Sequence, residues 1–141
     1  MGEEQRKTVL DFLRRHKHGV LSTVSLDGRP ESAAIEFGVT GEVEIIFDTY
    51  ITYRKYKNLQ TNSRVAFVVW EEDVTVQYEG DAIEISDVTV LKQIKTVFFS
   101  QVPEAKKFDQ AKDVRFFKVS PIWIRYRDYK LSPEPLFEVV L

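Results

Sequence analysis

The stretch at residues 48–59 reads Asp48-Thr49-Tyr50-Ile51-Thr52-Tyr53-Arg54-Lys55-Tyr56-Lys57-Asn58-Leu59. It follows a run at 42–47 in which apolar and acidic residues alternate, as they do in a half-buried strand. After this run, the hydroxyl side chains of Thr49 and Thr52 are both suitable N-caps. The pattern therefore predicts a strand over 42–47 followed directly by a helix over 49–60.

The charges in this predicted helix are unusual. A helix N-terminus has free N–H groups and about half a positive charge, so acidic residues are preferred in its first turn. Here the first turn carries Arg54 and Lys55 instead. Two cations, free N–H groups and hydroxyls that converge after a strand suit a phosphate group. A solvated basic helix face explains the same residues equally well at this point.

Composition limits the classes of function. The 141 residues favour one domain over 1–141, and a net charge of -2 argues against non-specific nucleic-acid binding. The absence of cysteine excludes disulfides and thiolate ligands, and His16 and His18 near the end of the first predicted helix make a histidine-rich metal site unfavourable. No apolar run reaches the roughly 20 residues that span a bilayer, and the polar start is unlike a signal peptide. We therefore expect a cytoplasmic protein that binds neither membrane nor metal.

Hydrophobic periodicity predicts the other elements. The segment over 64–70 is apolar on both faces and predicts a central strand. The inward-facing parity is expected to shift after Gly80, which indicates a bulge or a barrel corner, and Pro121 marks an edge or a bulge. Helices are predicted over 3–17, after Ser86-Asp87 and after Pro103-Glu104; further strands are predicted over 19–25, 31–37, 74–85 and 114–126.

These elements predict the fold class. Asp27-Gly28 between two strands is a strong hairpin signal. About six strands, mostly in hairpin order with helices inserted singly, predict a mainly β protein: a six-stranded antiparallel barrel rather than a doubly wound sheet. The second strand contains Ser32-Ala33-Ala34, whose small side chains leave room for a flat group to approach the backbone. Tight packing against another element is an equally good explanation for them.

Three segments in this order resemble a known family, the pyridoxamine 5′-phosphate oxidase-like FMN-binding split-barrel proteins. The first is the segment at 46–59 with its Arg-Lys pair, similar to the part of those proteins that holds the FMN phosphate. The second is the hairpin over 21–30, and the third is the strand over 76–82 that ends in Gly-Asp-Ala. The strand over 117–126 also fits, so the resemblance covers nearly the whole chain.

The resemblance implies an FMN-binding split barrel whose cofactor lies at a homodimer interface. Arg54 and Lys55 would pair with the phosphate, and Thr49 would donate its hydroxyl to the phosphate or the ribityl chain. The strand with the three small residues would lie along the isoalloxazine ring, and later residues would come from the other subunit. The implied cofactor-binding residues are Ser32, Ala33, Ala34, Asp48, Thr49, Thr52, Arg54, Lys55, Gln77 and Trp123.

The departures from the family pattern affect the expected activity. Many members place Ser or Thr directly before the Arg-Lys pair, where this chain has Tyr53, and Thr52 is the nearest substitute. The basic residue of many true oxidases on the second strand is missing, as is their arginine-rich C-terminal segment, so oxidation of pyridoxamine phosphate is not supported. We expect an FMN-dependent oxidoreductase of unknown substrate, with no catalytic residue assigned. The alternatives are an F420-binding reductase, a non-catalytic flavin-binding or stress-related module, and a cofactor-free barrel; haem would need one of the two histidines.

Overall fold

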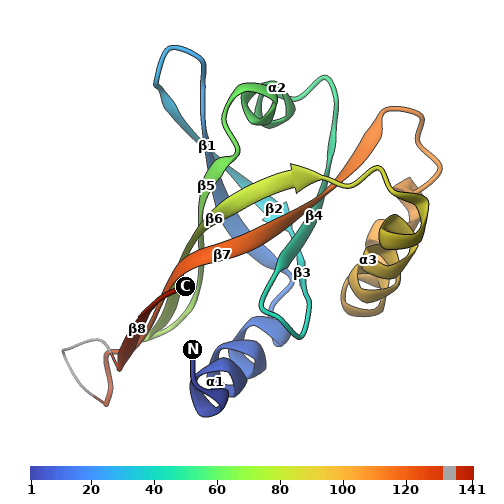
Figure 1. Cartoon of the computed structure of the whole chain (residues 1–141). Coiled ribbons are helices and arrows are strands. Elements are labelled where there is room, and N and C mark those ends of the chain that lie inside the picture. The colour runs from blue at the N-terminus through green and yellow to red at the C-terminus, as the bar shows by residue number, and fades with distance from the viewer. Residues whose placement is uncertain (132–135) are drawn as a thin grey trace.

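A computed structural model of the chain describes residues 1–131 and 136–141 (Figure 1). Its centre is one curled antiparallel sheet, and the helices lie at its ends and on one side. The strands are β1 (His18–Val24), β2 (Pro30–Glu36), β3 (Gly38–Val39), β4 (Ile45–Tyr50), β5 (Arg64–Glu71), β6 (Val74–Glu84), β7 (Val114–Asp128) and β8 (Phe137–Val140). The helices are α1 (Glu3–Arg14), α2 (Arg54–Thr61), α3 (Val88–Gln101) and the 3-10 helix η1 (Pro103–Phe108).

The sheet forms a half-barrel that is split between its two edge strands. The strand order is β2-β1-β5-β6-β7-β4-β3, with β8 paired to β7 beyond this path. The edges β2 and β3 are consecutive in the chain, joined only at Phe37. The mainly β, antiparallel split barrel predicted from the sequence is confirmed. The described residues form eight strands rather than about six, because β3 has only two residues and the short tail strand β8 joins the sheet.

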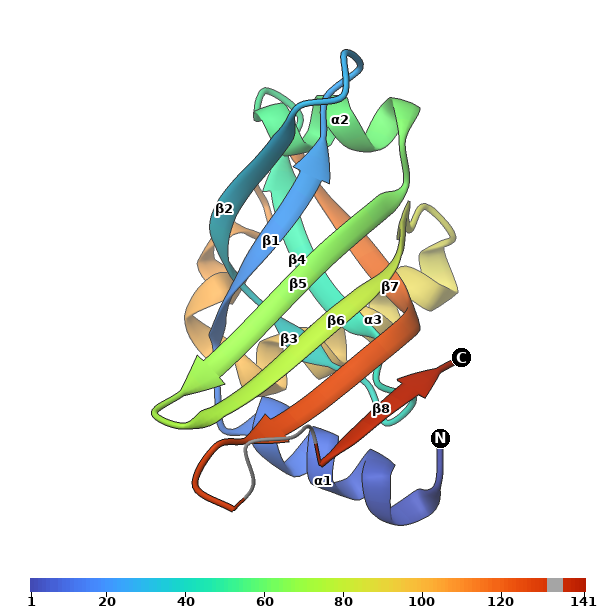
Figure 2. The same ribbon diagram turned by 90° about the vertical axis from the view of Figure 1, so that its left-hand side faces the viewer.

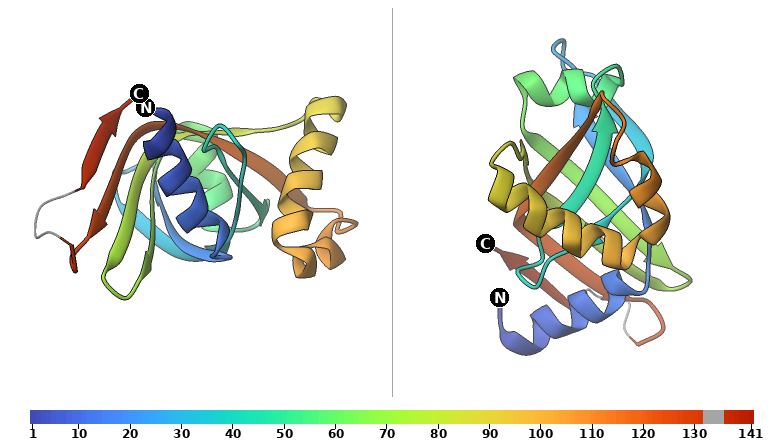
Figure 3. Two further views of the ribbon diagram at one scale, coloured as in Figure 1. Left: turned by 90° about the horizontal axis from the view of Figure 1, so that it is seen from below. Right: turned by 90° about the vertical axis from the view of Figure 1, so that its right-hand side faces the viewer.

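Two hydrophobic clusters lie on opposite sides of β4. The larger one fills the half-barrel, where α1 closes the lower end with its buried face, Val9, Leu10, Phe12 and Leu13. The smaller cluster packs α3 and η1 against the outside of the sheet, with Phe98 against Ile46 and Phe116 (Figure 3). Asp87 caps α3 as predicted, accepting a hydrogen bond of 3.0 Å from the Val90 N–H. None of the described helices is long and apolar enough to cross a membrane.

The segment around residue 48 differs from its prediction. β4 begins only at Ile45, so residues 42–44 of the predicted strand lie outside it. It continues to Tyr50, because the β7 ladder extends through the pairs Asp48↔Phe116, Thr49↔Arg115 and Tyr50↔Val114. Helix α2 therefore begins only at Arg54, with Tyr53 at the N-cap and no side-chain cap. The predicted caps were wrong: Thr49 lies in the strand and Thr52 in the turn that follows it. Nor is β4 half-buried, since α3 also covers its outer face.

The sheet has one face that no helix covers (Figure 2). The sequence predicts that β5 is a central strand with both faces apolar. Because this outer face is uncovered, β5 is buried on only one side. Val65, Phe67 and Val69 point into the barrel, whereas Ala66 is exposed and Trp70 is 56% exposed. Large apolar side chains on an uncovered sheet face are typical of a surface that meets another molecule.

The bulge predicted near Gly80 is present, but the extra residue lies in the partner strand. Tyr78, Gly80 and Ala82 all face inward, so the predicted parity shift does not occur. Glu79 pairs with Trp123 and Gly80 with Pro121, which leaves Ile122 of β7 unpaired. Pro121 thus lies next to a bulge, as the sequence indicated.

Gly80 lies in β6 where the neighbouring backbone of β7 leaves no room for a side chain. A Cβ atom at this position would lie 2.8 Å from Val119 Cγ1 and closer still to the Ser120 carbonyl oxygen. We expect Gly80→Ala to lower the free energy of unfolding by about 1–3 kcal/mol, the usual cost of overpacking. Urea denaturation followed by circular dichroism measures this change. Gly41→Ala is the control, since a Cβ there meets no atom within 4 Å; an equal effect of both substitutions would contradict the steric explanation.

Candidate functional site

The strands β1 and β2 and the start of α2 enclose a surface pocket of about 320 Å³. The hairpin between these two strands positions two of the lining residues. Gly28, with φ of 86°, makes the turn, and the strand register then places Thr23 opposite Glu31. The pocket is lined by Leu21, Thr23, Glu31, Ser32, Ala33 and residues 52–55.

Five of the residues predicted for the cofactor site line this pocket. Ser32 and Ala33 come from β2, and Thr52, Arg54 and Lys55 come from the turn and first helical turn that face it. Helix α2 has no acidic residue in its first turn and no side-chain cap. The first two residues of this helix, both cations, therefore line one hollow beside the helix N-terminus, an arrangement that favours an anion.

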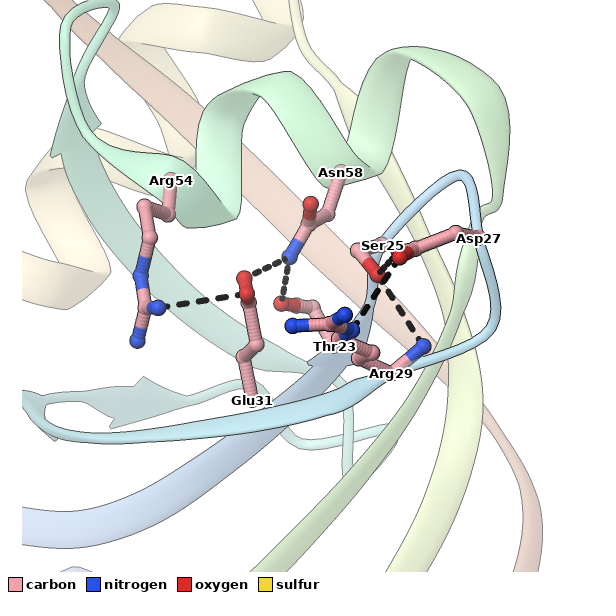
Figure 4. A network of polar contacts seen from close by, with 7 residues as sticks. All are labelled: Thr23, Ser25, Asp27, Arg29, Glu31, Arg54 and Asn58. Carbon is pink, nitrogen blue, oxygen red and sulfur yellow. Dashed lines mark hydrogen bonds and ion pairs between the residues drawn. The ribbon is translucent and has the colours of Figure 1, made fainter.

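Glu31 opposes this positive charge from inside the pocket. Its Oε2 lies 3.2 Å from Arg54 Nη1, and its Oε1 accepts a hydrogen bond of 2.8 Å from Asn58 Nδ2. The same Asn58 amide donates to Thr23 Oγ1 at 2.9 Å. Figure 4 shows Arg54 and Asn58 reaching down from α2 toward Glu31 and Thr23 on the hairpin strands. One carboxylate thus joins the helix to the sheet and pairs with one of the two predicted phosphate anchors.

The spacing of residues along β2 and α2 produces this network. Glu31, Ala33 and Ile35 alternate along β2 toward the barrel, so the carboxylate points to the same side as the core residue at the end of the strand. Arg54 and Asn58 are four residues apart and share one helix face. Asn58 is 5% exposed, and a buried amide must be hydrogen-bonded to avoid a large desolvation cost.

Lys55 and Asp48 form a second opposed pair of charges. Burial lowers the pKa of Lys55, and the charge of Asp48 acts in the opposite direction. Burial raises the pKa of Asp48 to about 6; Glu36 adds to this shift, and Lys55 opposes it. Asp48 is therefore partly protonated near neutral pH, beside a cation of the pocket.

Three other predicted residues are close in sequence to residues that line the pocket, but they do not line it themselves. Asp48 and Thr49 lie in β4, and Ala34 is exposed on β2. The Thr49 hydroxyl is notable because the residue is 3% exposed and its Oγ1 has no hydrogen-bond partner within the described residues. A buried hydroxyl without a partner is costly, so a ligand or water that reached it would gain a hydrogen bond.

Gln77 and Trp123 lie away from this pocket, on the outer face of the sheet. Gln77 pairs with Val68 and Arg125, and two strands separate its strand from β2. The Trp123 indole N–H donates a hydrogen bond of 2.8 Å to Glu138 on β8. Within one chain these two residues do not meet the pocket residues.

The sequence interpretation missed the acidic and amide members of the site. Glu31, Thr23 and Asn58 were not predicted, nor was Tyr53, whose ring lies 4.9 Å from Lys55 Nζ. The sequence contained a signal for two of these residues. Glu31 is an acidic residue at an inward-facing position of β2, and Asn58 follows Arg54 by four residues, the spacing of one helix face. Neither signal identifies its partner, because the pairing joins residues 23 positions apart.

The two histidines are remote from the pocket wall. His16 contacts the Phe12 carbonyl oxygen at 2.8 Å through Nδ1 and Glu71 Oε1 at 2.9 Å through Nε2, and His18 is exposed at the start of β1. The residues that line the pocket include no histidine. The described part of the chain contains no group of three or more His, Asp or Glu side chains arranged to hold a metal ion.

Comparison with known proteins finds the same fold. The family profile described as pyridoxamine 5′-phosphate oxidase matches residues 6–128. A search of curated proteins found no match. Among solved structures, a conserved hypothetical protein from Mycobacterium tuberculosis is 22% identical with a TM-score of 0.76, over 99% of this chain and 92% of that one.

Two further structures carry names that mention a role. General Stress Protein 26 from Bacillus anthracis is 20% identical with a TM-score of 0.73, and the match covers 100% of both chains. HutZ, the haem storage protein from Vibrio cholerae, is 20% identical with a TM-score of 0.69, over 86% of this chain and 91% of that one. At these identities the likeness shows the fold alone.

The raised pKa of Asp48 makes a stability prediction. The pKa of the Asp48 carboxyl is about 6 in the folded protein, whereas its ordinary pKa is 3.8. The protonated carboxyl therefore contributes fully to stability below about pH 3.8, and this contribution is lost as the pH rises through 6. Asp48→Asn carries no charge at any pH. We expect the free energy of unfolding of the variant, relative to wild type, to increase between pH 4 and pH 7 by on the order of 1 kcal/mol after solvent screening.

Urea denaturation at several pH values measures this difference. Glu79→Gln, at an exposed position of β6, controls for the loss of one negative charge. A difference between Asp48→Asn and wild type that stays constant from pH 4 to pH 7 would show that the Asp48 carboxyl is not perturbed.

Proposed function

Because this chain belongs to the pyridoxamine 5′-phosphate oxidase family, whose profile matches residues 6–128, we propose that it binds FMN and acts as a small flavin-dependent oxidoreductase. The observation that carries the proposal is the pocket in which Arg54 and Lys55 face the small residues of β2. Charge-assisted hydrogen bonds from two cations are a strong way to hold a phosphate.

Each part of the cofactor has a proposed contact. Arg54, Lys55 and the Thr52 hydroxyl bind the phosphate, and the buried Thr49 hydroxyl gains its missing partner from the phosphate or ribityl chain. The backbone beside Ser32-Ala33-Ala34 approaches the flavin ring, where small side chains leave it accessible. Asp48 sets the charge of Lys55 from behind the site. Bound FMN would supply the hydride or electron transfer, and the protein would supply binding, orientation and electrostatics.

The proposal does not extend to oxidation of pyridoxamine phosphate. The only charged residues of β2 are Glu31 and Glu36. A phosphorylated substrate near this strand would meet negative charge where a basic residue would be needed. The substrate class is therefore left to experiment, and no catalytic residue is proposed.

We also propose a homodimer formed through the uncovered face of the sheet. Trp70 on β5 is 56% exposed. Val140 on β8 is 80% exposed and pairs with Trp123 on β7. An exposed tryptophan and neighbouring apolar side chains suit the core of a protein interface. In a dimer, Gln77 and Trp123 of one subunit become available to a cofactor held by its partner.

Other cofactors of this fold give different spectra. An F420-binding reductase would use the same cations for a longer acidic tail. The name of the similar Vibrio protein mentions haem storage. Haem would need an axial ligand, and the described residues that line the pocket include no histidine. The absorption spectrum of freshly purified protein distinguishes flavin, deazaflavin and haem. Reduction by NADH or NADPH then separates an oxidoreductase from a flavin-binding module without turnover, such as a stress-related one.

The phosphate anchor is tested by comparing FMN with riboflavin. We expect Arg54→Ala combined with Lys55→Ala to weaken FMN binding by about a hundredfold or more, since each of the two charged hydrogen bonds contributes ~1.5–3 kcal/mol. Riboflavin, which has no phosphate, should be affected little. Flavin fluorescence quenching measures both dissociation constants. Lys57→Ala, on the same helix but not on the pocket wall, is the matched control; wild-type protein that fails to bind FMN would refute the proposed function.

The interface is tested by placing a charge on the uncovered face. We expect Trp70→Glu to remain folded but to shift the protein from dimer to monomer, because a buried unpaired carboxylate is unfavourable in an interface core. Light scattering coupled to size exclusion measures the mass. Leu26→Glu is the control, since Leu26 is 86% exposed at the tip of the β1–β2 hairpin. A monomeric wild-type protein, or a dimer that tolerates Trp70→Glu, would place the interface elsewhere or exclude it.

A further inference from the structure

Glu31 is the only acidic side chain among the described residues that line the ligand pocket. Its side chain is 19% exposed, and its two oxygens have different partners. Oε1 accepts a hydrogen bond of 2.8 Å from the Asn58 amide, and Oε2 lies 3.2 Å from Arg54 Nη1. The residue proposed to bind phosphate is thus already paired with an internal carboxylate.

The two members of this ion pair differ in their freedom to move. Glu31 is fixed by the strand ladder opposite Thr23 and by the bond from Asn58, which is itself 5% exposed. The Arg54 side chain is 76% exposed, in the first turn of α2. If the pair separates, Arg54 moves and Glu31 stays where it is.

The ion pair also stands between two hollows. On one side is the pocket already described. On the other is a second hollow of about 480 Å³, between the hairpin tip and α2, and both Glu31 and Arg54 line it as well. A phosphate that binds Arg54 from the pocket must draw the guanidinium away from Glu31. It must also accept a fixed negative charge close by.

We propose that Glu31 is a specificity-determining residue, whose carboxylate competes with the ligand phosphate for Arg54. This inference rests on the proposed function, because it concerns the flavin site. It identifies which ligands lose affinity to Glu31: those whose anionic group must displace the carboxylate from Arg54, such as the phosphomonoester of FMN. A ligand with a neutral group there leaves the ion pair intact and loses nothing, since only a charged group gains enough from Arg54 to displace Glu31.

The substitution Glu31→Gln tests the proposal. Glutamine keeps an amide oxygen that can accept the hydrogen bond from Asn58, but it has no charge and cannot hold Arg54 as an ion pair. We expect the dissociation constant for FMN to fall about tenfold, because the phosphate no longer has to displace a carboxylate from Arg54, and a hydrogen bond to a charged group is worth about that factor. The dissociation constant for riboflavin should not change, because riboflavin has no phosphate.

Two controls separate competition from general effects of charge. Glu42→Gln removes one negative charge at the opposite end of the barrel, where Glu42 pairs with Arg6, and should leave FMN binding unchanged. In an Arg54→Ala background, the gain from Glu31→Gln should largely disappear. A full gain without Arg54 would mean simple repulsion and would overturn the competition.

The remaining outcomes also discriminate. If Glu31→Gln changes FMN and riboflavin binding by the same factor, Glu31 has only a structural role. If wild-type protein binds FMN and Glu31→Gln binds it equally well, this inference fails while the proposed function stands. If neither protein binds FMN, the proposed function fails together with the inference.

Discussion

The antiparallel contact between β6 and β7 is the constraint on which the rest of the sheet depends. β7 pairs with β6 over most of its length, and its other edge is shared by β4 and β8. The bulge at Ile122 and the absence of a side chain at Gly80 allow the two strands to bend together. The buried Tyr78 hydroxyl donates to the carbonyl oxygens of Val43 and Val119, at 2.8 and 3.0 Å, and so ties the bend to the start of β4.

This curl decides where the pocket forms. Because the sheet closes only partly, the edge strand β2 comes back toward the end of β4, and α2 lies across the opening above β1. The cations at the start of α2 therefore face the small residues of β2, although about 20 residues separate them along the chain. The other half of the expected site, Gln77 and Trp123, lies on the uncovered face of the same sheet. A single chain presents the two groups of residues separately, and this separation is the reason we propose that a second copy completes the site.

The sequence predicted much of this because the relevant signals were local. The Asp27-Gly28 turn and the cap at Asp87 each depend on a few neighbouring residues, and both appear in the structure. The start of α2 was wrong because the decisive interaction is distant: pairing with β7 keeps Thr49 and Tyr50 in the strand. Burial on one or both faces of a strand was also unpredictable, since it depends on where α3 packs. The ion pair between Glu31 and Arg54 was missed for the same reason.

The distribution of charge in the pocket limits how a ligand can gain affinity. Arg54 faces Glu31, and Lys55 faces Asp48, so each cation has an internal carboxylate. The two pairs are not equivalent: burial raises the pKa of Asp48 to about 6, whereas Glu31 is held beside an exposed guanidinium. A phosphate therefore meets a pocket in which a carboxylate opposes each cation. In the proposed complex, phosphate binding therefore contributes less than two free cations would, so the flat part of FMN, which we propose packs on β2 under a second subunit, must supply more of the binding energy.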